Sequence, residues 1–229
     1  MKHSGKATKA AFKLIVYSLI AGCVIWAVMW VGLWIGAILT TIAAPALFIL
    51  WLAFSVFTIY FFRDPTPRVP MGANLVVSPG HGKIDVIDST TEPAFMGGEC
   101  QRVSMFLSVF DVHVQNAPVA GKLAFFKYTI GHFLNAMRTE SATHNENLLL
   151  GFETVGPQQQ KVGVRLIAGV IARRIVPFVE QGDEVARGER ISLIQFGSRA
   201  DVYLPANAKI KVKLGDHVVG GETVLAVFE

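Results

Sequence analysis

The chain has 229 residues, of which 52% are hydrophobic, and its mean hydropathy is +0.46. This balance excludes an ordinary soluble domain and indicates membrane segments. The net charge of +4 comes from four lysines in the N-terminal tail, because the other 17 of the 21 basic residues balance the 17 acidic residues, all of which follow residue 62. A nucleic-acid-binding domain would carry a basic surface, so we expect no nucleic-acid partner.

Residues 1–13 form the basic tail, and residues 14–62 contain no charged side chain. One spanning helix needs about 20 apolar residues. The run therefore predicts a transmembrane hairpin of two helices with a turn near 32–45. A cleaved signal peptide is the weaker interpretation, because its apolar core is only about 7–15 residues long. Basic residues flank both ends of the run, which predicts that both ends, and the domain at 63–229, lie at the cytoplasmic face of the inner membrane.

The two cysteines predict neither a disulfide nor a zinc site. Cys23 lies inside the apolar run, Cys100 lies in the following domain, and neither has a C-x-x-C partner. The sequence also lacks the glycine motifs of nucleotide-binding loops. We therefore expect no metal and no nucleotide.

The domain at 63–229 contains an internal repeat. "GDEVARGE" (182–189) and "GDHVVGGE" (215–222) share the pattern G-D-x-V-x-x-G-E, and "SPGHGKI" (78–84) resembles "APVAGKL" (117–123) more loosely. Glycine and aspartate favour tight turns between short strands, so we predict a mainly β (α+β) fold made of two similar half-barrels. The pattern resembles the barrel-sandwich fold of biotinyl and lipoyl carrier domains. Their carrier lysine has no counterpart here, because the link between the halves holds Gly197 and Ser198.

Two further stretches are more specific. They are "FLSVFDVHVQNAPVAG" (106–121) and "FGSRADVYLP" (196–205), and they follow "VVSPGHGKI" and the apolar N-terminus in that order. Together they resemble the short, membrane-anchored form of the pyruvoyl-dependent phosphatidylserine decarboxylases. The resemblance extends from about residue 61 to the C-terminus.

This resemblance implies a self-cleaving enzyme. The Ser198 hydroxyl would attack the Gly197 carbonyl, and chains 1–197 and 198–229 would stay associated. A pyruvoyl cofactor derived from Ser198 would then bind the amine of phosphatidylserine and act as the electron sink for its decarboxylation to phosphatidylethanolamine. The family also suggests a homodimer.

Three side chains are candidates for proton transfer. His113 is the leading acid or base, and Asp111, two residues away, would share its face on a regular strand and orient the imidazole. His81 stands where the family has aspartate. Either His81 is itself the base for self-cleavage, held by Asp85, Asp88 or Asp111, or cleavage is slow or absent. For each of these residues a purely structural role is the alternative.

Weaker substrate-binding candidates are Arg199, Ser141, Asn145, Met105 and Phe106. An ion pair, a solvated loop and core packing are their respective alternatives. Three rival functions remain open: a non-catalytic membrane-tethered module, a decarboxylase of a related serine phospholipid, and a decarboxylase of a soluble amine or amino acid.

Overall fold

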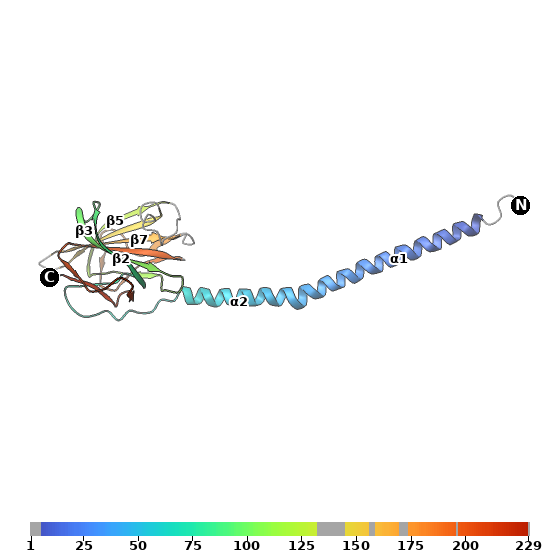
Figure 1. Cartoon of the computed structure of the whole chain (residues 1–229), viewed down its shortest axis with the longest axis horizontal. Helices are drawn as coiled ribbons and strands as arrows, with labels where there is room; N and C mark the ends of the chain where they lie inside the picture. The colour runs from blue at the N-terminus through green and yellow to red at the C-terminus, as the bar shows by residue number, and fades with distance from the viewer. Residues whose placement is uncertain (1–5, 132–144, 156–158, 170–173, 196, 229) are drawn as a thin grey trace. The chain divides into compact units, whose positions relative to one another are not determined.

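The structure, a computed structural model, describes residues 6–131, 145–155, 159–169, 174–195 and 197–228. The chain divides into two compact units, residues 1–58 and 59–229. The first is helical, and the described regular elements of the second, apart from the end of α2, are strands (Figure 1). The predicted mainly β class with an apolar helical N-terminus is confirmed.

The N-terminal unit departs from the predicted transmembrane hairpin. Helix α1 (Lys6–Ile38) continues through a π-helix, η1 (Leu39–Ala43), into α2 (Ala44–Phe61). Among the described residues, Val16–Phe61 is the one helix long and apolar enough to cross a membrane.

The residues expected to form a turn are accommodated within this helix. Thr40 and Thr41 donate their hydroxyls to the carbonyls of residues 36 and 37. Pro45 has no N–H to donate within an α-helix. In the wider π turn just before it, the Ala44 N–H donates to the Leu39 carbonyl. Breakers in the sequence therefore produce a local change of helix type and not a reversal of the chain.

The second unit holds fourteen described strands, all paired antiparallel. A large sheet has the order β13-β2-β3-β11-β7-β6-β5-β9, and two small sheets have the orders β1-β14-β12 and β4-β10-β8. The strands are β1 (Leu75–Val77), β2 (Gly82–Glu92), β3 (Gly98–Leu107), β4 (Val114–Asn116), β5 (Gly121–Thr129), β6 (Asn147–Thr154), β7 (Lys161–Ala168), β8 (Ile175–Pro177), β9 (Glu184–Val185), β10 (Arg190–Ile194), β11 (Ser198–Leu204), β12 (Ala208–Ile210), β13 (His217–Val218) and β14 (Val224–Phe228).

The sequence repeat corresponds to a repeated turn. Gly182 and Gly215 both have positive φ, +106° and +92°, and each following aspartate accepts a hydrogen bond from the backbone N–H three residues earlier. The strand after each turn pairs with one of the looser repeats, β9 with β5 and β13 with β2. The relation to carrier domains is a prediction that these contacts do not test.

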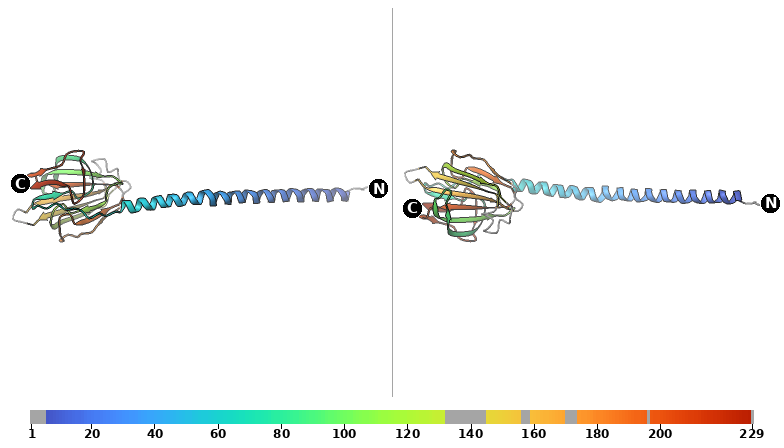
Figure 2. Two further views of the ribbon diagram at one scale, coloured as in Figure 1. Left: turned by 90° about the horizontal axis from the view of Figure 1, so that it is seen from below. Right: turned by 90° about the horizontal axis from the view of Figure 1, so that it is seen from above.

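Strand β11 lies inside the large sheet, and all seven of its residues are buried. It pairs along one edge with β3 and along the other with β7, and Figure 2 shows the strands of this unit from two sides. The start of β11, at Ser198, is therefore fixed by hydrogen bonding on both sides.

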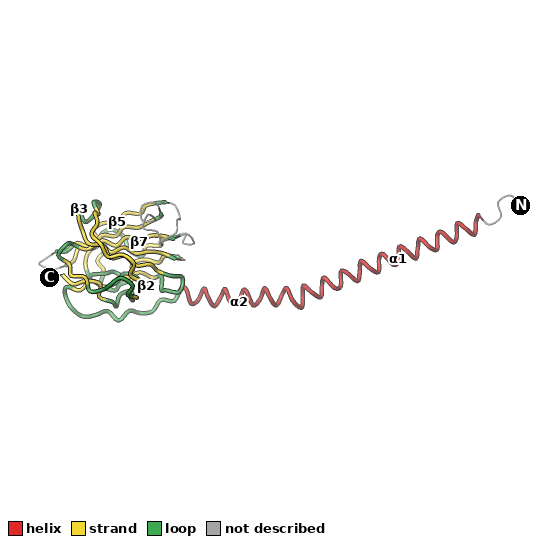
Figure 3. The backbone as a smooth tube through the Cα atoms, in the orientation of Figure 1, coloured by secondary structure: helices red, strands yellow, loops and turns green. Residues whose placement is uncertain are grey.

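Residues 63–74, which form no strand, connect α2 to β1 as a long loop (Figure 3).

Candidate active site

The Gly197–Ser198 bond lies where a loop enters β11. Ser198 is fully buried, and its Oγ has no hydrogen-bond partner. Gly197 has φ +72°, a left-handed conformation that other residues adopt at a cost. A buried hydroxyl left without a partner costs free energy, and at Ser198 this hydroxyl directly follows the left-handed Gly197.

His113 is held against Gly197 by the small sheet. Strand β4, which follows His113, pairs with β10, and the Ile194 N–H donates to the His113 carbonyl at 3.1 Å. The imidazole is fully buried, with its centroid 4.3 Å from that of the Phe61 ring. Its Nε2 accepts the Gly197 N–H at 3.2 Å, so its proton sits on Nδ1, which donates to the Asp111 carbonyl at 2.9 Å.

The surroundings of His113 favour the neutral imidazole. Burial, the largest effect, lowers its pKa to about 4, and the positive charges of Arg63 and His81 act in the same direction. The bond to the Asp111 carbonyl and the Asp111 charge oppose this shift. In the uncleaved chain at neutral pH, His113 is therefore a hydrogen-bond acceptor at Nε2.

The buried neutral His113 predicts an acid-sensitive precursor. Its pKa is lower in the folded state than in the unfolded state, so the unfolded chain binds more protons between about pH 6.5 and 4. The stability of uncleaved Ser198→Ala protein should therefore fall as the pH falls through this window, by up to roughly 3 kcal/mol from this group. Urea unfolding at several pH values measures it. Adding His113→Gln should make the curve shallower, and identical curves for the two proteins would contradict the assignment.

Asp111 contacts His113 through its backbone and not through its carboxylate. Residues 108–113 form a turn before β4 and not a regular strand, so the predicted shared strand face is absent. The carboxylate accepts from the Ser108 N–H and hydroxyl, both at 2.8 Å, and lies 3.0 Å from the exposed His217 Nε2. Asp111 thus fixes the turn whose carbonyl orients the imidazole.

His81 lies half-buried between β1 and β2. Burial lowers its pKa, while the Asp111 charge raises it. The three carboxylates expected to hold His81 are bound elsewhere: Asp85 to Arg199, Asp88 to Arg102, and Asp111 to Ser108 and His217. His81 makes no hydrogen bond to Ser198, whose hydroxyl is unpartnered.

Arg199 is 1% exposed and internally paired. Its guanidinium donates to both Asp85 oxygens, at 2.7 and 3.1 Å, and to Asp201 Oδ1 at 3.1 Å. Asp201 is fully buried, and sequence reasoning missed it. The sequence did contain a signal for this pair, because Arg199 and Asp201 are two residues apart and such residues share one face of a strand. The pairing engages the guanidinium and fixes the start of β11.

The other candidates divide between the site and the core. Asn145 is buried and donates to the Ala168 carbonyl at 2.8 Å, at the end of β7 opposite Ser198. The next residue, Gly169, donates its N–H to the Gly197 carbonyl at 3.1 Å, a contact that the sequence did not suggest. Met105 belongs to the core, Phe106 is half-buried, and Ser141 lies outside the described residues.

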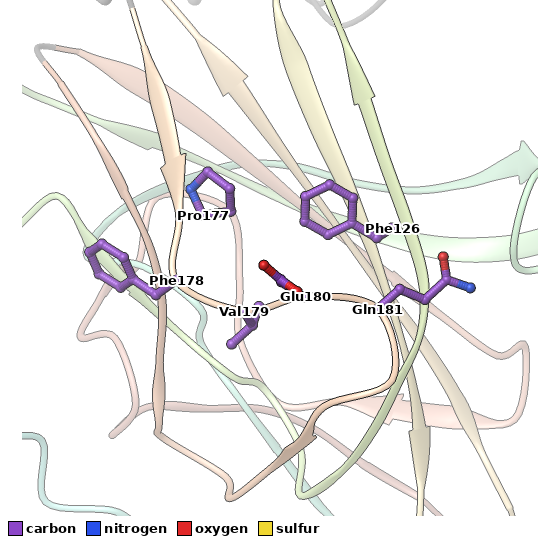
Figure 4. Close-up of a pocket in the computed structure, with 6 residues that line it drawn as sticks. All are labelled: Phe126, Pro177, Phe178, Val179, Glu180 and Gln181. Atoms are coloured by element: carbon purple, nitrogen blue, oxygen red, sulfur yellow. The ribbon is translucent and has the colours of Figure 1, made fainter.

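A pocket of about 420 Å³ occurs elsewhere in this unit (Figure 4). It is lined by Phe126, Pro177, Phe178, Val179, Glu180 and Gln181. None of the candidate catalytic residues lines it. A pocket is a default candidate site where apolar walls surround convergent polar groups and perturbed titratable residues, and in this chain the buried histidine with the strongly lowered pKa, His113, lies elsewhere.

Comparison with known proteins identifies the family. The family model for phosphatidylserine decarboxylase matches residues 54–226. This chain belongs to the phosphatidylserine decarboxylase family. Two relatives, from Desulfotalea psychrophila and Symbiobacterium thermophilum, are named phosphatidylserine decarboxylase proenzyme. Each is 42% identical over 193 residues, which cover 82% of this chain and 89% of the relative. The resemblance inferred from the sequence is confirmed, and the word proenzyme in both names implies a processed precursor in those decarboxylases.

Proposed function

We propose that this chain cleaves itself at Gly197–Ser198 and then decarboxylates phosphatidylserine to phosphatidylethanolamine. One observation carries the proposal. In a member of this family, the Ser198 hydroxyl is buried and unpartnered, and it follows a left-handed glycine whose N–H is bonded to His113.

The cleavage step needs no outside reactant except water. Ser198 Oγ attacks the Gly197 carbonyl carbon, and the peptide becomes an ester as the C–N bond breaks. The Gly169 N–H already bonds that carbonyl oxygen, and a donor in this position stabilises the negative charge that develops there. Elimination leaves Gly197 as a carboxylate, and water then releases the serine nitrogen as ammonia, giving a pyruvoyl group at position 198.

The residues of the chain have separate tasks in decarboxylation. The pyruvoyl group, once formed, supplies the electron sink. His113, the buried titratable group bonded to Gly197, is positioned to return the proton that replaces carbon dioxide. Asp111 orients the imidazole through its carbonyl, and the Arg199 pairs hold the start of β11 in register.

The direct test combines a denaturing gel with an assay of carbon dioxide release. Purified protein should yield fragments of 197 and 32 residues, the smaller with a blocked N-terminus, and should release carbon dioxide from phosphatidylserine vesicles. A lasting full-length band with no release would instead support a non-catalytic membrane module. Cleavage with carbon dioxide release only from another serine phospholipid would mean that the same decarboxylation acts on that lipid instead.

The His81→Asp variant tests the residue that departs from the family pattern. Among the described residues His81 makes no hydrogen bond to a carboxylate or to Ser198, so we expect aspartate to speed self-cleavage, followed as loss of precursor over time. His81→Asn is the matched control, because it removes the imidazole without adding a carboxylate. If His81→Asp instead stops cleavage, His81 is the base.

We further propose that the catalytic unit works at the bilayer surface. Its first residues are the end of the apolar helix, where the Tyr60 hydroxyl and the Arg63 guanidinium both donate to the Phe110 carbonyl, at 3.3 and 2.6 Å. Arg63 also stacks on the Tyr60 ring at 3.9 Å. Aromatic rings and arginine at the end of an apolar helix are typical of the membrane interface. The 65% exposed Phe110 thus sits at that level, three residues before His113.

The Phe110→Glu variant should separate lipid access from chemistry. A carboxylate at the interface opposes insertion, so we expect slower decarboxylation of long-chain phosphatidylserine in vesicles, by about tenfold if roughly 1.4 kcal/mol of surface contact is lost. Self-cleavage and activity on a water-soluble short-chain phosphatidylserine should stay near wild type. Phe110→Leu is the control. Equal losses on both substrates would place Phe110 in the chemistry instead.

For the side of the membrane we propose the cytoplasmic face of the inner membrane. At 1.5 Å per residue, the 46 residues of Val16–Phe61 span about 69 Å, roughly twice the hydrocarbon core. A reversal within this run, which the continuous helix as described does not contain, would let it cross twice and return both basic ends to one side. Impermeant thiol labelling of Lys6→Cys and Lys122→Cys, each with Cys23→Ala, should fail in intact cells. Labelling at only one position would mean a single crossing. Sedimentation in detergent tests the homodimer expected from the family.

A further inference from the structure

We propose that the Gly197 carboxylate released by self-cleavage stays against the imidazole of His113 and holds a proton on it in the mature enzyme. The inference rests on the self-cleavage proposed above. In this proposal the Gly197 carboxylate, a by-product of self-cleavage, is a positioning group that acts through His113.

Two backbone contacts hold Gly197, and both are made to residues of the same fragment, 1–197. Its N–H is bonded to His113 Nε2 at 3.2 Å, and its carbonyl oxygen accepts the Gly169 N–H at 3.1 Å. Cleavage breaks the bond after the carbonyl carbon, so neither contact is cut. The ester made by Ser198 Oγ then breaks at the Cβ–Oγ bond of residue 198 as its Cα proton is lost. Gly197 keeps that oxygen as its second one and becomes a carboxylate without any oxidant.

Backbone geometry keeps the new charge close. Within one residue the nitrogen and the carbonyl carbon are about 2.5 Å apart. The carboxyl carbon of Gly197 therefore forms within about 6 Å of His113 Nε2. A protonated Nε2 can no longer accept the Gly197 N–H, so that bond is exchanged for one in which Nε2–H donates to the new carboxylate. The Gly169 N–H is already aimed at one of its oxygens and provides a donor for the anion in a partly buried place.

The new charge reverses the balance around the imidazole. In the precursor, the His113 imidazole contacts the Phe61 ring and the Asp111 carbonyl, the Asp111 carboxylate and the Arg63 and His81 side chains act on it electrostatically, and burial keeps its pKa at about 4. An opposite charge within 4–6 Å raises the pKa of a histidine. His113 then changes from a neutral acceptor in the precursor to a protonated group that can donate after maturation.

Titration of His113 in two forms of the full chain tests the inference. ¹⁵N-histidine-labelled wild-type protein, matured, is compared with uncleaved Ser198→Ala in the same detergent, with His113→Gln to assign the resonance and the exposed His217 as internal reference. We expect the His113 midpoint of the mature form to lie higher by about 1–3 pH units. Equal midpoints in the two forms would overturn the proposal.

A third form separates the charge from the chain break. Hydroxylamine cleaves the ester intermediate of the wild-type precursor and leaves a neutral hydroxamate on Gly197. The His113 midpoint in this form should not rise above that of the uncleaved variant, and a rise equal to that of the mature enzyme would also overturn the inference. If the wild-type chain cleaves and releases carbon dioxide while the midpoint stays unchanged, the proposed function stands and only this inference fails.

Discussion

Ser198→Ala should remain a single full-length chain and release no carbon dioxide from phosphatidylserine vesicles. The variant lacks the oxygen that attacks Gly197, so neither the ester nor the pyruvoyl group can form. The loss should therefore be complete, in contrast to the partial losses expected from residues that only assist. Denaturing gels and intact mass measure the cleavage, and trapped carbon dioxide measures the activity.

Ser104→Ala is the matched control. Ser104 is also fully buried in the large sheet with an unpartnered Oγ, on the neighbouring strand β3. It differs from Ser198 in lacking a left-handed glycine before it and a histidine at that glycine. Ser104→Ala should cleave and decarboxylate like the wild type. If Ser198→Ala still cleaves, the scissile bond is elsewhere.

His113→Gln should reduce decarboxylation by about 10²–10⁴-fold per cleaved chain, the range expected for loss of a proton-transfer group. The amide oxygen of glutamine can still accept the Gly197 N–H, which keeps the geometry of the cleavage site. Carbon dioxide release is divided by the cleaved fraction from the same gel, because the variant can mature more slowly.

The control for this variant is His217→Gln. His217 is exposed and pairs with the Asp111 carboxylate, and surface pairs of this kind contribute about 0–1 kcal/mol. Its activity should stay close to wild type. A His113→Gln enzyme with activity per cleaved chain within about tenfold of wild type would show that another group moves the proton.

The sequence predicted the parts of the site that lie within one continuous motif. Gly197, Ser198 and Arg199 stand in "FGSRADVYLP", and the structure places them at the start of a buried strand, as strand-like residues around a glycine indicate. The mainly β class followed from the repeated turns. Both inferences depend on residues that lie close together in the sequence.

The parts that the sequence did not give depend on contacts between distant segments. Asp85 was one of three carboxylates considered as a partner of His81, but it pairs with Arg199, 114 positions away. Gly169 bears no side chain that marks it, and it matters only because β7 ends beside β11. The hairpin expectation was not met for a different reason, since Thr40, Thr41 and Pro45 can be satisfied within a widened helical turn.

The position of β11 within the sheet requires strand pairing to come before the proposed cleavage. The last 32 residues contain β11 to β14, and the partners β1, β2, β3 and β7 all precede the proposed cleavage point. Gly197 meets His113 and Gly169 once these strands have paired, so an unfinished or misfolded chain would not carry out the proposed cleavage. After that cleavage the small fragment would stay hydrogen-bonded within the sheet and would separate only on unfolding. Self-activation would therefore be confined to chains that have completed folding.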